Sequence, residues 1–287
     1  MSAIAYVNGA FVPQHQATVS IMDRGFLFAD GIYEVSAVLD GKLVDNDLHM
    51  ARLERSVREI NLALPLPTSA ISALMRELVT RNTLIEGLVY LQVTRGADAN
   101  RNFSFPKVVK PSLVMFCDVF DYIDTPKAKT GIKVKSVPDI RWARRDIKSV
   151  ALLAQVLAKQ AATAEDCHEA WMHEDGVITE GSSSTAYIVK GEGAAARIVT
   201  RGNSWKILPG CTRQALLALA SETGIEIEER PFTLDEAYGA REAFLTSATN
   251  FVMPVTMIDG KAIGGGQVGP VARRLRELYI EHARRGE

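Results

Sequence analysis

The stretch "RRDIKSVALLAQVLAKQ" (144–160) places one lysine where two kinds of predicted structure meet. The apolar residues Val150, Leu153 and Leu157 recur at i, i+3 and i+7, which predicts a helix with one buried face. Lys148 stands directly before this helix, at the end of an extended, strand-like stretch. Most lysines lie on exposed surfaces, so a lysine between two apolar elements is unusual. A lysine amine attacks carbonyl carbons and forms Schiff bases, which makes Lys148 a candidate nucleophile.

Length and composition predict a globular protein of about two domains. The chain has 287 residues, of which 47% are hydrophobic and 23% charged. Its net charge is −1 and it contains no run of five like charges, which argues against a nucleic acid or an anionic membrane as partner. No transmembrane helix or signal peptide is predicted. Cys117, Cys167 and Cys211 are odd in number and far apart, which favours reduced thiols in a cytoplasmic protein over disulfides or a zinc site.

Turn signals and apolar periodicity predict an α+β chain in two lobes. Hairpins are expected at three dipeptides: Asn8-Gly9, Asp40-Gly41 and Asp259-Gly260. Helices are expected over 47–62, 68–81 and 270–283. The polar stretch "DYIDTPKAKTG" (121–131) contains a Pro and a Gly between two strand-like runs, so it is the expected interdomain loop. The predicted domains are therefore 1–120 and 132–287.

A second motif, "ITEGSSSTAYIV" (178–189), places Glu180 before a serine-rich turn. Such a composition usually means only a polar turn. The functional alternative is a carboxylate that stabilises the protonated ring nitrogen of a bound cofactor.

A third motif, "ILPGCTRQALLALA" (207–220), opens a helix after a Pro-Gly turn. The first backbone N–H groups of a helix have no partner within the helix and lie at its positive end, so they suit a phosphate. Ser247 and Thr249, from "LTSATN" (245–250), supply further hydroxyl groups. Arg52 flanks the apolar stripe of its helix, where it is either an exposed charge or long enough to reach a buried phosphate. A lysine nucleophile, a ring-nitrogen carboxylate and a phosphate site are together what pyridoxal phosphate requires.

Several motifs resemble the fold-type IV pyridoxal-phosphate aminotransferases, and in particular the D-amino acid aminotransferases. The resemblance runs in order from about Val7 to the C-terminal helix. It rests on five segments: "DRGFLFADGIYEV" (23–35), "VTRG" (93–96), "DIRWARRDIKSVALLAQVLAKQ" (139–160), "TEGSSST" (179–185) and "ILPGCTRQ" (207–214).

This resemblance implies a small N-terminal α/β domain and a larger C-terminal domain with a pseudo-barrel. It also implies a homodimer with its active sites at the domain and subunit interface. Lys148 would be the Schiff-base lysine and the acid/base, Glu180 would pair with the pyridine nitrogen, Arg52 would hold the phosphate and Leu208 would support the ring face. The remaining phosphate-binding residues would be Cys211, Thr212, Ser247, Ala248 and Thr249.

For the substrate carboxylate, the resemblance implies Tyr33 and Arg101. Phe103 stands where the D-amino acid subfamily has a histidine. An arginine alone still makes a bidentate contact to a carboxylate. The loss of the imidazole donor is expected to weaken or redirect this contact, or to admit bulkier substrates.

The implied activity is transfer of an amino group from a D-amino acid, such as D-alanine, to a 2-oxo acid, such as 2-oxoglutarate, with ping-pong kinetics. Three alternatives share the fold type: a branched-chain L-amino acid aminotransferase, an (R)-amine transaminase and an aminodeoxychorismate lyase. An alternative from another class is a cofactor-binding protein without turnover, against which the presence of both Lys148 and Glu180 argues.

Overall fold

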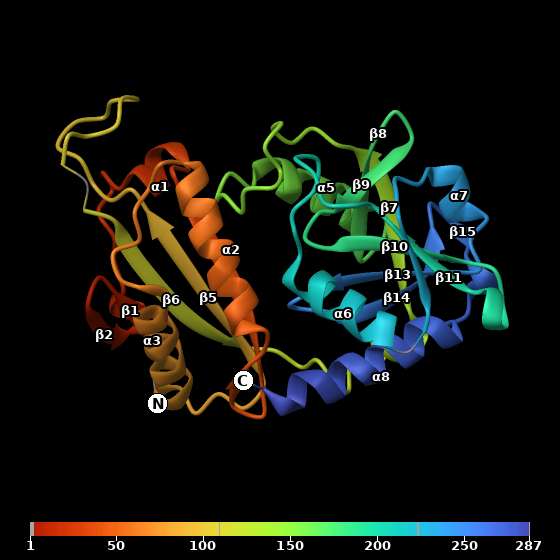
Figure 1. Ribbon diagram of the computed structural model, residues 1–287. Coiled ribbons are helices and arrows are strands. Elements are labelled where there is room, and N and C mark those ends of the chain that lie inside the picture. Colours follow the sequence, from red (N-terminus) through yellow and green to blue (C-terminus); the bar gives the residue numbers. More distant parts are fainter. Residues whose placement is uncertain (1–2, 109, 223, 287) are drawn as a thin grey trace. The chain divides into compact units, whose positions relative to one another are not determined.

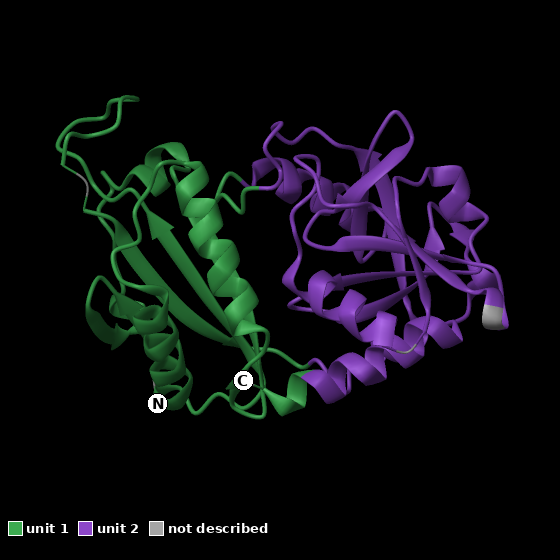
Figure 2. Cartoon of the chain, in the orientation of Figure 1, with its two compact units in different colours: residues 1–121, 147–151, 283–287 green, residues 122–146, 152–282 purple. Residues whose placement is uncertain are grey.

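The computed structural model describes residues 3–108, 110–222 and 224–286 (Figure 1). The chain divides into two compact units, which Figure 2 shows in different colours. Unit 1 comprises residues 1–121, 147–151 and 283–287, and unit 2 comprises 122–146 and 152–282. The short segment that carries Lys148 therefore groups with unit 1 although unit 2 precedes and follows it in the sequence. Among the residues described, no helix has the length and apolar character needed to cross a bilayer.

Unit 1 is an antiparallel sheet with strand order β2-β1-β6-β5-β3-β4. Its strands are β1 (Ile4–Val7), β2 (Ala10–Pro13), β3 (Gly31–Leu39), β4 (Lys42–Leu43), β5 (Gly87–Thr94) and β6 (Ser112–Val119). Its helices are η1 (Gln14–Gln16), α1 (Arg24–Phe28), α2 (Asn46–Glu59) and α3 (Thr68–Arg81). Leu53 of α2 and Met75 of α3 are fully buried with the central strands in one apolar core.

Unit 2 is built on a nine-stranded mixed sheet of order β12-β11-β10-β13-β14-β7-β8-β9, with β15 added to β14. Its strands are β7 (Ile132–Pro138), β8 (Glu169–Glu174), β9 (Val177–Gly181), β10 (Thr185–Lys190), β11 (Arg197–Thr200), β12 (Glu226–Glu229), β13 (Glu242–Ser247), β14 (Phe251–Ile258) and β15 (Lys261–Ala262). β9 ends this order yet contacts β10, which lies near the other end, so the sheet curls towards a barrel. The curled sheet confirms the expected pseudo-barrel.

Helices surround this sheet in Figure 1. They are α4 (Pro126–Thr130), α5 (Leu153–Ala164), η2 (Gly193–Ala195), α6 (Cys211–Glu222), α7 (Leu234–Tyr238), η3 (Gly264–Gly266) and α8 (Pro270–Arg285). α4 forms within the stretch expected to be an interdomain loop, and the last residues of α8 belong to unit 1.

The hairpin predictions are confirmed. The dipeptides at 8–9, 40–41 and 259–260 all have positive φ at both positions, and each joins two paired antiparallel strands. This left-handed conformation suits Asn or Asp followed by Gly, and its twist matches that of the strands. The helix expected over 68–81 has those bounds, and the other two helices differ from expectation by one to three residues at an end.

The predicted buried face of α5 is wrong. Leu153 and Leu157 are 72% and 52% exposed, whereas Ala158 and Ala162 on the other face are buried against β8. Small side chains let the helix approach the sheet closely. Periodicity identified the helix but could not decide which of its two apolar faces packs inward.

Candidate active site

Lys148 is fixed to the edge of β3 by the backbone on both sides of it. Tyr33 N donates a hydrogen bond to Lys148 O at 3.0 Å, and Val150 N donates to Gly31 O at 3.1 Å. Ile147, the preceding residue, is buried in the core of unit 1. The segment therefore pairs with β3 as a short antiparallel bridge and is held by the buried Ile147 side chain, which fixes the backbone of Lys148.

The Lys148 side chain is half-buried and faces an aromatic surface. Its Nζ lies 4.1 Å from the centroid of the Tyr33 ring. Tyr33 stacks on Tyr90 with centroids 5.7 Å apart, and Tyr90 stacks on Phe116 at 4.8 Å. The structure therefore brings together the predicted catalytic lysine and the predicted substrate-binding tyrosine.

Arg52 is buried, which excludes the alternative of an exposed helix charge. It projects from α2 towards β3 and binds the carboxylate of Glu34, which is fully buried; His49 Nδ1 lies 2.8 Å from the same carboxylate. Burial alone would raise the pKa of Glu34, but the charge and hydrogen bonds of Arg52, helped by His49, hold it well below its usual range. Arg52 is thus held in a fixed orientation by an ionised partner.

Arg101 and Phe103 also belong to unit 1, on the loop between β5 and β6. Both are exposed, Phe103 to 77%. The predicted residues in unit 2 are Glu180, Leu208, Cys211, Thr212, Ser247, Ala248 and Thr249.

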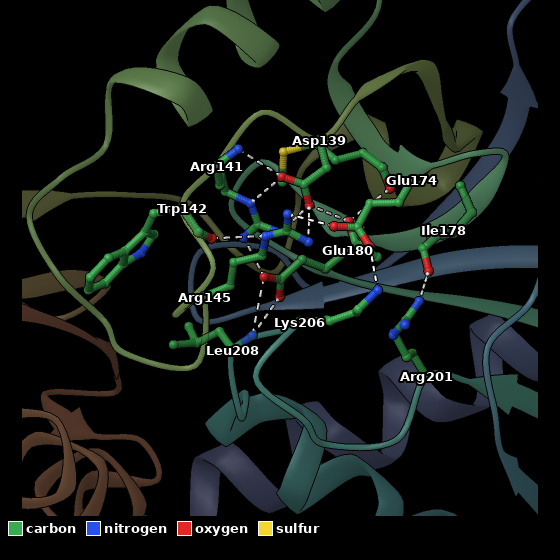
Figure 3. Close-up of polar contacts among 12 residues, drawn as sticks. Asp139, Arg141, Trp142, Arg145, Glu174, Ile178, Glu180, Arg201, Lys206 and Leu208 are labelled. Carbon is green, nitrogen blue, oxygen red and sulfur yellow. Dashed lines mark hydrogen bonds and ion pairs between the residues drawn. The ribbon is translucent and has the colours of Figure 1, made fainter. Parts of the chain in front are cut away.

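Glu180, the residue before the end of β9, is a buried carboxylate, 4% exposed, within a network of charges (Figure 3). Arg141 Nη1 donates to its Oε1 at 2.5 Å, and Leu208 N donates to both carboxylate oxygens at 3.2 Å. Burial raises the pKa of Glu180, and Arg141 and the Leu208 N–H offset part of that rise. Glu180 and Leu208, both predicted from the sequence, are therefore direct neighbours.

Arg141 is in turn held by Asp139, whose Oδ2 lies 2.8 Å from Arg141 Nη2 and also accepts from Thr179 Oγ1 at 2.6 Å. Arg145 continues the network, with ion pairs of 3.2 Å to Asp139 and 2.8 Å to Glu174. The pKa of Asp139 is lowered because Arg141 and Thr179 outweigh the effect of burial. Glu180 therefore stands at one end of a chain of alternating charges.

The serine-rich turn after Glu180 closes around a second buried carboxylate, Glu169. The hydroxyl groups of Ser182, Ser183 and Ser184 all donate to it, Ser184 at 3.0 Å, and the Ala170 N–H donates at 2.8 Å. The three serines are therefore not merely a polar turn, because they fix the backbone that presents Glu180.

The predicted phosphate-binding residues lie at two neighbouring places in unit 2. At the start of α6, Gln214 N donates to Gly210 O at 3.0 Å, and Cys211 and Thr212 are the first two residues of the helix, where backbone amides have no carbonyl partner within the helix. A side chain on Gly210 would meet Thr185 Oγ1 at 3.1 Å. Thr185 pairs with Thr246, the residue before the 247–249 turn. The turn before α6 and the end of β13 therefore flank the same strand, β10.

Within the 247–249 turn, Ser247 Oγ lies 3.3 Å from Thr249 Oγ1 and accepts from Asn250 Nδ2 at 2.9 Å. The three predicted residues of this turn are half-buried.

Sequence reasoning missed four charged residues that position the site: Glu34, Asp139, Arg141 and Glu169. Asp139 and Arg141 lie in the quoted "DIRW" motif, and Glu34 lies in "DGIYEV". These three residues could have been found in the sequence, because each is a charged residue within an otherwise apolar strand or next to one. No comparable pattern links Glu169 to serines 13 to 15 residues away.

Comparison with known proteins identifies the family. The model of the family described as amino-transferase class IV matches residues 31–258. The chain is 40% identical over 282 residues to a D-alanine aminotransferase of Staphylococcus haemolyticus, covering 96% of this chain and 97% of the relative. It is 37% identical to a D-alanine aminotransferase of Bacillus licheniformis, covering 94% and 93%. Among solved structures, a branched-chain amino acid aminotransferase from T.th. with pyridoxamine 5'-phosphate superposes with a TM-score of 0.90 at 25% identity, covering 99% of this chain and 95% of that one. This chain belongs to the class IV aminotransferases, with their fold-type IV architecture.

Proposed function

We propose that the protein is a pyridoxal-phosphate-dependent transaminase that moves the amino group of a D-amino acid to a 2-oxo acid. Identity of about 40% to D-alanine aminotransferases along nearly the whole chain carries the choice of substrate class. The branched-chain aminotransferase at 25% identity keeps L-amino acids as the second candidate.

The residues present fit pyridoxal phosphate. Glu180 is a buried carboxylate suited to a protonated ring nitrogen, and Arg141 and the Leu208 N–H fix its direction. The amides of Cys211 and Thr212, with the hydroxyl groups of the 247–249 turn, are donors of the kind that bind phosphate. Arg52 would add the positive charge.

When bound, pyridoxal phosphate supplies an electron sink for the pair left by the broken Cα–H bond. The chain's own residues perform the remaining tasks. Glu180 would hold the proton on the ring nitrogen. The amine of Lys148 would take the proton from the substrate Cα, and its backbone bonds to β3 keep it in place while it does so. Tyr33 and Arg101 would bind the substrate carboxylate.

The test is turnover by the purified holoenzyme. D-alanine with 2-oxoglutarate should yield pyruvate and D-glutamate, identified by chiral chromatography, with the parallel double-reciprocal plots of a ping-pong mechanism. Lys148→Ala and Lys148→Arg should both abolish this turnover while the protein remains folded. Turnover of L-leucine or (R)-1-phenylethylamine in place of D-alanine would move the protein to one of the alternative activities, and full turnover by Lys148→Ala would overturn the role of the lysine.

We further propose a homodimer in which a second copy covers the exposed face of α5. Leu153, Val156 and Leu157 lie on one side of this helix and are 72%, 59% and 52% exposed. Three large aliphatic side chains at i, i+3 and i+4 are typical of a helix face that a partner covers. Leu157→Glu should shift the protein from dimer to monomer in sedimentation velocity. Val119→Glu, at an 86% exposed aliphatic residue on β6, is the matched control and should leave the dimer intact.

We also propose a cytoplasmic location, which the three free cysteines support because a reducing environment keeps thiols unpaired.

A further inference from the structure

The loop between β5 and β6 carries an exposed aromatic residue that nevertheless packs against a second aromatic ring. Phe103 is 77% exposed, yet its ring centroid lies 5.2 Å from that of Phe28, at the end of α1. The two planes are tilted by 43°, so the rings form an angled surface. An isolated exposed phenylalanine would gain little from a fixed orientation, whereas a pair of rings offers a surface for another group.

Arg101 occupies that surface. The central carbon of its guanidinium lies 4.9 Å from the Phe28 centroid and 5.5 Å from the Phe103 centroid. Both distances are within the range of cation–π attraction. A guanidinium that stacks on a ring through its face keeps its N–H groups in the plane, where they remain suited to a carboxylate.

The backbone beneath Arg101 is held by a buried arginine, Arg24. Its guanidinium donates to three successive carbonyl oxygens, those of Asn102 at 2.5 Å, Phe103 at 3.2 Å and Ser104 at 3.3 Å. Arg24 Nε donates to Asp30 Oδ2 at 2.8 Å. Only a forked, planar cation can serve so many acceptors at once, so a lysine would not replace it.

A second arginine, Arg95, binds the same oxygen of Asp30, and Arg24, Asp30 and Arg95 together form the anchor of the loop. Arg95 Nε donates to Asp30 Oδ2 at 2.8 Å, and the Arg95 guanidinium lies 3.6 Å from the centroid of the Phe105 ring. The two arginines outweigh burial and lower the pKa of Asp30, so this link between them stays charged. Every contact of the anchor lies within unit 1.

We propose that Phe103 and Phe28 form a platform that orients Arg101 towards the substrate carboxylate, with Arg24 fixing the loop backbone beneath it. This inference rests on the proposed function. Phe103 is then a positioning residue that acts through Arg101. The donor lost with the subfamily's histidine is offset by a better-oriented arginine.

The test is a double-mutant series on the holoenzyme. Phe103→Leu should raise the KM for D-alanine about three- to tenfold with little change in kcat, because a contact to the bound carboxylate is loosened. Phe103→Tyr should keep the wild-type KM, because tyrosine retains the aromatic ring that leucine lacks. In an Arg101→Ala background, Phe103→Leu should have no further effect.

A second readout does not depend on activity. Hydrogen exchange of the amides in 97–106 should become faster in Phe103→Leu and in Arg24→Lys. It should stay unchanged in Phe120→Leu, the same substitution beyond the opposite end of β6. Because Phe103 is exposed, its variant tests the platform even if Arg24→Lys does not fold.

The outcomes separate the two proposals. A wild-type enzyme that does not use D-amino acids refutes the proposed function before any variant is made. A wild-type enzyme that uses them, with KM and loop exchange both unchanged in Phe103→Leu, refutes the platform alone. A KM effect of Phe103→Leu that persists without Arg101 would also refute it, because Phe103 would then act on the substrate by another route.

Discussion

Arg52 forms a bidentate ion pair with both carboxylate oxygens of Glu34 in the core of unit 1. Its Nε lies 2.8 Å from Oε1 and its Nη2 lies 2.7 Å from Oε2. The glutamate is fully buried and the arginine is 9% exposed. A buried bidentate pair fixes orientation strongly, and removal of either partner leaves the other as a buried charge without this counter-ion.

Glu34→Gln should therefore lower the free energy of unfolding by about 3–5 kcal/mol at neutral pH, because Arg52 keeps its charge and loses its counter-ion. Urea unfolding measures this loss. The control is Glu77→Gln, which breaks a pair with Arg81 in which both side chains are nearly half exposed, and which should cost less than about 1 kcal/mol. Equal effects of the two substitutions would contradict a net contribution from the buried pair.

The same pair should make stability depend on pH in the acid range. The folded-state pKa of Glu34 lies below its ordinary value of 4.5, so the folded state resists protonation that the unfolded state accepts. Its contribution is fully present above the unfolded pKa and is lost as the pH falls from there towards the folded pKa. Wild-type stability should therefore decline below about pH 5, and Glu34→Gln should decline less steeply. Parallel stability curves for the two proteins would rule out this source of acid sensitivity.

Local patterns were sufficient to predict most of the elements. The Asn-Gly and Asp-Gly turns need positive φ and so fix three hairpins, and the period of apolar residues located α2, α3 and α8. The buried face of α5 could not be predicted in this way. Both faces of that helix are apolar, and whether leucine or alanine packs inward depends on how closely the helix approaches its sheet.

For a related reason, the sequence predicted Lys148, Arg52 and Glu180 as site residues but not the charged residues that hold Arg52 and Glu180 in place. Motifs indicate residues that are expected to contact a cofactor, but the groups that hold those residues in place come from distant positions. Glu34 meets Arg52 across 18 residues, and Arg141 meets Glu180 across 39. Such pairs form only once the fold has brought distant elements together, so no local pattern predicts which two residues will pair.

Glu169→Gln should loosen the turn that presents Glu180. One carboxylate oxygen accepts from the Ala170 N–H and Ser182, and the other from Ser183 and Ser184. An amide keeps only one acceptor oxygen and carries no charge, so two of these donors lose their charged acceptor and the hydroxyl groups at the NH₂ must turn to accept. We expect a loss of about 1–3 kcal/mol in the free energy of unfolding. Faster hydrogen exchange confined to the amides of 181–184 would locate the effect. Glu165→Gln, in an ion pair with Lys135 where Glu165 is 58% exposed, is the control, and an equal loss there would refute a special role for Glu169.

Arg141→Met should move the acid limb of the kcat/KM profile to higher pH. Burial raises the pKa of Glu180 and Arg141 opposes that rise, so without the guanidinium the carboxylate becomes protonated at a higher pH than in the wild type. A protonated Glu180 cannot balance a charged ring nitrogen, so activity should be lost first at the acid end and recovered as the pH is raised. The control is Arg201→Met. Arg201 belongs to the cluster in Figure 3, but its hydrogen bond at 2.9 Å goes to the backbone oxygen of Ile178. It acts on Glu180 through its charge alone, so Arg201→Met should move the acid limb less than Arg141→Met does. A purely structural role for Arg141 predicts a different result, a lower rate at every pH with the limb unmoved, and that result would disprove the electrostatic assignment.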